Sequence, residues 1–182
     1  MISSTLRLIK TELNEFLARQ FPADAFTVQA NKLVTQDGKS ALNKDLHQVV
    51  ITLLNVQEER TMQRSRTSDP QRPYYLNLLL LFSVHPKESE TAEEDYLEGL
   101  SYLDAVLLFF QQQSVFTPQS HQNLPLGIHH LQFDLASEDL RETSYIWTIT
   151  GAKYAPSVLY RVRSIGIGQP SSLSTASFIG ST

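Results

Sequence analysis

The chain has 182 residues, a length that favours one domain with its own core, and its 41% hydrophobic and 19% charged residues are typical of a globular protein. Its formal net charge of −4 and pI of about 5.7 argue against a dedicated nucleic-acid binder, which usually carries a basic face. It contains no cysteine, which excludes disulfides, thiolate nucleophiles and cysteine-ligated metal sites.

The N-terminal residues predict an amphipathic helix that ends before Pro22. Its apolar residues recur at helical spacing and form one stripe, made of Ile2, Leu6, Ile9, Leu13, Phe16 and Leu17. Ser3, Ser4 or Thr5 is expected to cap its start. No basic segment followed by an apolar block opens the chain, and no apolar run approaches the roughly 20 residues of a membrane span, so we expect a soluble protein without a signal peptide or membrane partner.

Two apolar stretches predict central strands, after a short strand from Phe26 to Gln29. They run from His47 to Val56 and from Tyr74 to Val84, and both are apolar on both faces, as strands covered on both sides are. In the first, alternate residues are expected to point to one face (Val49, Ile51, Leu53) and to the other (Val50, Leu54, Val56).

The stretch from Gln57 to Pro73, between these strands, has no apolar period and predicts a long exposed loop, a kind of segment that often carries function. Its charged residues are predicted to contact partners: Glu58, Glu59, Arg60, Arg64, Arg66 and Arg72. One interpretation is a solvated loop whose arginines pair with its own acidic residues. The other is a docking arm for an acidic partner, because guanidinium groups pair with carboxylates and stack on aromatic rings.

A second helix is predicted from about Glu90 to Gln112, with Thr91 and Glu94 forming a capping box at its start. The predicted buried stripe contains Tyr96, Leu97, Leu100, Leu103, Val106, Leu107 and Phe110. Its first half is acidic, because no basic residue lies between Glu88 and Asp104. These acidic side chains are interpreted as a solvated or partner-facing surface; the alternative is metal binding or catalysis.

The rest of the chain predicts a strand from Ile128 to Leu135, a third helix capped by Ser137 with Trp147 in the core, and a last strand from Ser157 to Ile167. The order is α-β-β-β-α-β-α-β. It predicts a single α+β domain over residues 1–167, with a mixed, mostly antiparallel sheet covered by helices. Residues 168–182 are rich in Ser, Thr and Gly and are expected to form a flexible tail.

Catalytic motifs are missing from the sequence. His129 and His130 are neighbours on a predicted strand and would point to opposite faces, while His47, His85 and His121 stand apart from one another. The glycines near the last strand lack the spacing of a phosphate loop, and no serine lies in a nucleophile elbow. The sequence therefore predicts no catalytic residue, no cofactor and no metal ligand, and an enzyme is the least favoured interpretation.

Two segments carry a resemblance to a known family. The strand end Leu53-Leu54-Asn55-Val56-Gln57-Glu58-Glu59 leads into the arginine-bearing loop, and Ile146-Trp147 is followed by Tyr154-Ala155-Pro156-Ser157-Val158-Leu159-Tyr160-Arg161-Val162. With the N-terminal helix and Arg72-Pro73 before the Tyr-Leu-rich strand, the chain resembles the tail-terminator, or cap, family of extracellular contractile injection systems of the antifeeding-prophage and virulence-cassette type. The resemblance covers residues 1–167.

This resemblance implies a phage tail-terminator-like fold and a structural subunit without catalysis or cofactor. Six copies would form a hexameric ring that ends the inner tube and anchors the last sheath layer, so the implied partners are further copies, the tube protein and the sheath protein. Assembly would take place in the cytoplasm, as part of a contractile injection particle. The alternatives are another ring or adaptor of the same machine, at the baseplate or the start of the tube, and a free-standing binding module.

Two expectations concern assembly. The acidic helix face of one copy would meet the arginine loop of the next, because opposite patches that meet head to tail can close into a ring. Phe178 and Ile179, isolated apolar residues in the tail, would become ordered on a neighbouring or sheath subunit.

Overall fold

The computed structural model describes residues 1–24, 26–59, 74–89 and 91–167. Its elements, in chain order, are α1 (Ile2–Gln20), β1 (Phe26–Ala30), β2 (His47–Glu58), β3 (Tyr74–His85), α2 (Ala92–Gln112), β4 (Val115–Phe116), β5 (Leu131–Ala136), α3 (Leu140–Thr150) and β6 (Ser157–Ile167). The predicted order is confirmed, with the short strand β4 as an addition. None of the helices in this described part is long and apolar enough to span a membrane.

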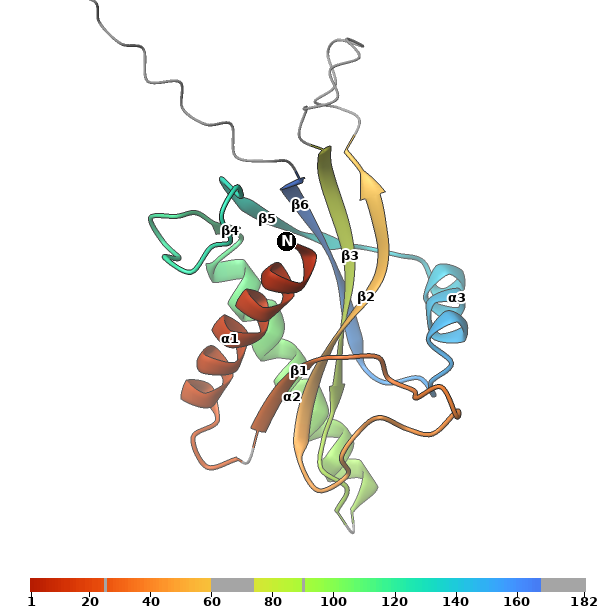
Figure 1. The fold of residues 1–182 in the computed structure, drawn as a ribbon. Coiled ribbons are helices and arrows are strands. Elements are labelled where there is room, and N and C mark those ends of the chain that lie inside the picture. Colours follow the sequence, from red (N-terminus) through yellow and green to blue (C-terminus); the bar gives the residue numbers. More distant parts are fainter. Residues whose placement is uncertain (25, 60–73, 90, 168–182) are drawn as a thin grey trace, which may run out of the picture.

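The strands form one mixed sheet in the order β1-β2-β3-β6-β5-β4 (Figure 1). Strand β1 pairs with β2 in parallel, and every other neighbouring pair is antiparallel. The predicted α+β class with a mostly antiparallel sheet is therefore confirmed.

Helices α1 and α2 cover one face of the sheet and enclose the larger core (Figure 1). The predicted stripe of α1 faces this core, where Ile9, Leu13 and Leu17 are fully buried. The centre of the core is aromatic: the Phe110 ring of α2 lies 4.4 Å from the ring of Tyr160 and 5.1 Å from that of Phe82, measured between centroids. Burial of such rings is a dominant contribution to the stability of a core.

The opposite face carries α3 and the connection between β1 and β2 (Figure 1). They enclose a smaller core of Leu33, Val50, Leu81, Trp147 and Leu159. The core position of Trp147 is thus confirmed, as is the expectation that both central strands are apolar on both faces.

A bulge in β2 changes the facing of its last residues. The register between β2 and β3 shifts between Leu53 and Asn55, so that Val56 lies opposite Leu78, a residue of the larger core. Residues directly opposite each other on paired strands share a face. Val56 therefore points to the helix-covered side, and its predicted place with Val50 and Leu54 is wrong, because simple alternation does not anticipate an inserted residue.

The helix starts differ from their predicted caps. The cap of α1 is Met1, and Ser3, Ser4 and Thr5 already lie inside the helix. Thr91 precedes α2 as predicted, but its side chain makes no capping hydrogen bond. Helix α3 is capped by Asp139, whose carboxylate accepts a hydrogen bond from the Glu142 amide at 2.8 Å, and the predicted cap Ser137 is wrong.

The buried face of α2 is rotated relative to the predicted stripe. Its buried residues include Gly99, Tyr102, Ala105, Val106, Phe109 and Phe110. Tyr96 and Leu97, predicted to be buried, are 54% and 57% exposed. The close approach of Pro86 to Gly99 explains this rotation, because a Cβ at Gly99 would lie only 3.3 Å from the proline Cδ atom, which brings this side of the helix against the end of β3.

The two outermost strands of the sheet are short. Strand β1 has five residues and β4 has two. The main-chain amide of Val28, in the middle of β1, donates a hydrogen bond to the Asn14 side-chain oxygen of α1 at 3.0 Å. This edge amide is therefore satisfied within the molecule.

Candidate interaction surfaces and a carboxylate pocket

The β2–β3 ribbon extends beyond the helices at one end of the sheet (Figure 1). Glu58 is exposed there, and the amide of Glu59 donates to the Tyr75 carbonyl at 2.8 Å. A Glu59 carboxylate oxygen also accepts a hydrogen bond of 2.7 Å from Asn77. The two predicted contact residues of the strand end are thus placed at the tip of the ribbon, where Glu59 is held in position.

The remaining predicted contact residues lie outside the described part of the chain. They are Arg60, Arg64, Arg66 and Arg72 in the loop, and Phe178 and Ile179 in the tail. Their roles remain predictions. The described strands fix only the point from which the loop leaves the sheet.

The start of α2 combines acidic and apolar side chains at the surface. Glu93, Glu94 and Asp95 lie in its first turn, which favours negative charge because of the helix dipole. Tyr96 and Leu97 are exposed beside them. The acidic face predicted from the sequence is therefore mixed with apolar surface, a combination that is typical of a contact region.

A second apolar surface, missed by the sequence interpretation, lies on α3. Tyr145 and Ile149, one helical turn apart, are 56% and 77% exposed, and Leu140 at the start of the helix is 87% exposed. The guanidinium of Arg141 lies 5.8 Å from the centre of the Tyr145 ring. The sequence pattern of α3 could not identify this face, because the helix has apolar residues on both sides. Which side is buried depends on how the helix packs against the sheet.

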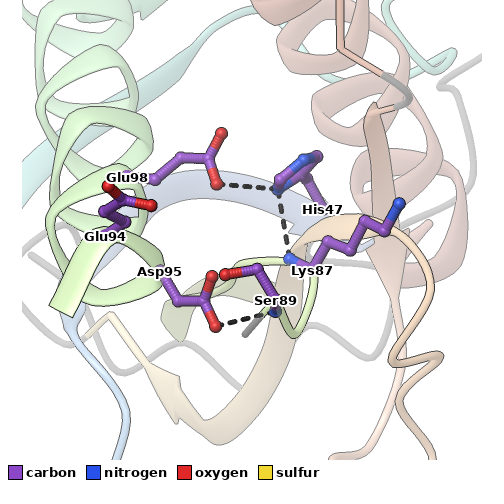
Figure 2. A pocket seen from close by; sticks show the side chains of 6 residues that line it. All are labelled: His47, Lys87, Ser89, Glu94, Asp95 and Glu98. Atoms are coloured by element: carbon purple, nitrogen blue, oxygen red, sulfur yellow. Dashed lines mark hydrogen bonds and ion pairs between the residues drawn. The ribbon is translucent and has the colours of Figure 1, made fainter. Parts of the chain in front are cut away.

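An open pocket of about 440 Å³ lies where β2 and α2 begin (Figure 2). His47, Lys87, Ser89, Glu94, Asp95 and Glu98 line it. The Asp95 carboxylate accepts a hydrogen bond from the Ser89 amide at 2.9 Å. The side chain of Ser89, and after it this amide, lower the pKa of Asp95. The Lys87 amide donates to Nδ1 of His47 at 3.1 Å, which positions the imidazole ring.

Tyr102 contacts Glu98, one of the residues that line this pocket. Its ring is fully buried, and its hydroxyl lies 3.1 Å from both Asp24 Oδ2 and Glu98 Oε1. Burial and the two carboxylates raise the pKa of Tyr102 far above its usual value, so the phenol is protonated. Glu98, interpreted from the sequence as part of a surface, instead turns inwards to Tyr102 and to His47, whose Nδ1 is 3.6 Å from Glu98 Oε2.

The histidines that stand apart in the sequence acquire partners in space. Asp24, His47 and Glu98 each offer one ligand atom, and these atoms lie within 4.8 Å of one another, the one such group of three in the described residues. His121 Nε2 lies 3.6 Å from Glu12 Oε2, and its ring stacks on Phe116 at a centroid distance of 3.8 Å. Such contacts join residues far apart in the chain, so spacing in the sequence could not reveal them.

Both the sequence and the fold of the chain are similar to those of known proteins. A family model described as the Pvc16 N-terminal domain matches residues 4–180. The fold is also similar to a solved structure of an extracellular contractile injection system, the PVC sheath/tube terminator in its extended state, with a TM-score of 0.59 and 14% sequence identity. The match covers 100% of this chain and 61% of that one, so the chain spans about three fifths of its length. None of the curated proteins compared with the chain matches it.

Proposed function

The chain belongs to the Pvc16 N-terminal domain family, and from this we propose that it is a structural subunit that terminates the tube and sheath of a contractile injection system. The family match over residues 4–180 carries this proposal, and it agrees with the resemblance to tail terminators found in the sequence. The shared fold with the PVC sheath/tube terminator supports it further.

In the proposed assembly, copies of the chain form a hexameric ring on the last layer of the inner tube and hold the last sheath layer. Its partners are then further copies, the tube protein and the sheath protein, and the subunit itself catalyses no reaction. Assembly takes place in the cytoplasm, before the particle is used or released. A ring on a tube end also explains why the exposed surface of a small domain carries both charged and apolar patches.

Four parts of the chain are proposed to make these contacts. The acidic start of α2 and the arginine loop at the tip of the β2–β3 ribbon supply opposite charges for neighbours in the ring. The exposed apolar side chains of α3 supply surface that a ring contact can bury, and such burial favours association. Phe178 and Ile179 in the tail are proposed to contact the sheath.

The proposal is tested by imaging particles from cells that lack the gene, with restoration by the full chain as the control. Without a terminator, tubes should vary in length and lose their sheath at the end distal to the baseplate. Restoration with a chain that stops at Ile167 should recover tube length but leave the sheath loosely attached. Particles of normal length and sheathing in the deletion strain would disprove the role, and a labelled subunit found at the baseplate would assign it to another ring.

A further inference from the structure

We propose that Asp24, His47 and Glu98 form a binding site for a divalent cation of the zinc type, which ties the start of β2 to α2 and to the segment before β1. The three residues come from separate parts of the chain, and their ligand atoms lie within 4.8 Å of one another. Zinc–ligand distances are about 2.0–2.2 Å, so two ligand atoms of one ion lie at most about 4.4 Å apart. Small rotations of these side chains would bring the imidazole nitrogen and the two carboxylate oxygens within that limit.

The hydrogen bonds around Tyr102 leave this cluster short of donors. A phenol carries one hydrogen, so it can donate to either Asp24 or Glu98, although both oxygens lie 3.1 Å away. The other carboxylate then faces the phenolic oxygen without a proton between them. Close contacts of this kind are unfavourable inside a protein unless a positive charge compensates them.

The second Glu98 oxygen has the same shortage. It lies 3.6 Å from Nδ1 of His47, and this nitrogen accepts the hydrogen bond of the Lys87 amide. An imidazole nitrogen that accepts has no proton to donate to a carboxylate. A cation placed among the three side chains would satisfy the carboxylate oxygens that the surrounding donors leave over. It would also take the Nδ1 lone pair in place of the Lys87 amide, which lies at an exposed position where water can replace the lost hydrogen bond.

Access and charge also favour a cation. The side chain of His47 is only 12% exposed while that of Glu98 is 39% exposed, so the cluster is sheltered on one side and open to the pocket on the other. Glu94 and Asp95 add negative charge to the pocket wall, and the Lys87 side chain extends away from the carboxylates (Figure 2). Negative walls of this kind raise the local concentration of cations, and the open side leaves room for water as a further ligand.

The ligand set indicates which cations bind. An imidazole nitrogen favours zinc and similar transition metals, whereas calcium and magnesium prefer an all-oxygen set. We therefore expect Zn²⁺ to bind with one ion per chain and Mg²⁺ to bind much more weakly. Because the ligands come from three segments, the bound ion should stabilise the folded chain.

The test uses the full chain after treatment with a chelator, with isothermal titration calorimetry and thermal unfolding in ZnCl2 and in MgCl2. At free zinc about 100-fold above its Kd, the Tm should rise by roughly 5–10 °C. Glu98→Gln keeps the size of the side chain and an acceptor for Tyr102 but loses the charge, and it should weaken zinc binding at least about tenfold.

Glu12→Gln is the matched control, because Glu12 Oε2 also lies 3.6 Å from a histidine nitrogen, that of His121, but belongs to no described group of three ligands. This variant should bind zinc as the unmodified chain does. NMR of the histidine side chains tests the site in the unmodified protein, without any substitution. Addition of zinc should shift the resonances of His47 and leave those of His121 unchanged. The proposed site would be wrong if the chain did not bind one zinc ion, or if both variants lost zinc affinity equally. It would also be wrong if zinc shifted only the NMR resonances of histidines other than His47.

Discussion

His85 shows how a single side chain couples the stability of this fold to pH. It ends β3, and its Nε2 lies 2.9 Å from the hydroxyl of the buried Ser83. Burial lowers the pKa of His85 from 6.5 to about 4, because the charged form loses hydration. The folded chain therefore keeps this imidazole neutral over a pH range in which the unfolded chain protonates it.

The sign of the pH dependence follows from this difference. As the pH falls, His85 takes up a proton near pH 6.5 in the unfolded chain but only near pH 4 in the folded chain. The contribution of the neutral His85 to stability is therefore complete above pH 6.5 and is lost as the pH falls towards 4. We expect the free energy of unfolding to fall by roughly 2–3 kcal/mol over this interval through His85. Urea unfolding between pH 7 and pH 4 measures it.

Replacement of the ring provides the control for this prediction. A His85→Gln variant should lose most of the pH dependence below 6.5, whereas His129→Gln, at an exposed position outside the strands, should retain it. An unchanged pH profile in His85→Gln would show that other groups cause the acid sensitivity.

Among the elements, those with strong apolar patterns were predictable and those that depend on distant contacts were not. Strands β2 and β3 are apolar on both faces, so their central place and their two-sided burial followed from the sequence. The rotation of α2, by contrast, depends on the approach of Pro86 to Gly99, and the bulge after Leu53 depends on pairing with β3. The carboxylate pocket needs three segments brought together, which no local pattern encodes.

Helix α2 also contributes Phe110, an aromatic residue at the centre of the larger core. The Phe110 ring lies within 4.4–5.1 Å of four other aromatic rings, those of Phe82, Phe109, Phe133 and Tyr160. Phe110→Ala removes this packing and leaves a cavity, so it should lower the free energy of unfolding by about 3–5 kcal/mol in chemical denaturation.

Leu108 is the matched position on the same helix. It is 38% exposed, so Leu108→Ala should cost less than about 1 kcal/mol. Equal costs for the two variants would mean that α2 is not packed on the sheet as described.

At the scale of the whole molecule, the proposed ring depends on opposite charges at separate places on one subunit. Reversal of two loop charges, Arg64→Glu with Arg66→Glu, should weaken ring assembly or docking to the tube, because the acidic start of α2 would then meet a like charge. Electron microscopy should show fewer capped tubes. The strength of the effect should increase at low salt, where surface charges are less screened.

The matched control reverses two exposed charges on the outer side of α1, Arg7→Glu with Lys10→Glu. It changes the net charge by the same amount but leaves the loop intact, so tubes should be capped as usual. Normal capping by the variant with Arg64 and Arg66 reversed would show that the loop takes no part in the contact.

The short sheet edges have a consequence for how copies can join. A long free strand edge invites another chain to add main-chain hydrogen bonds one after another, which leads to open-ended polymers. Here β4 offers two residues, and the central amide of β1 is already bonded to Asn14. In the proposed ring, β1 and β4 would therefore offer a neighbouring copy few main-chain hydrogen bonds, and contacts at these two strands would depend on side chains.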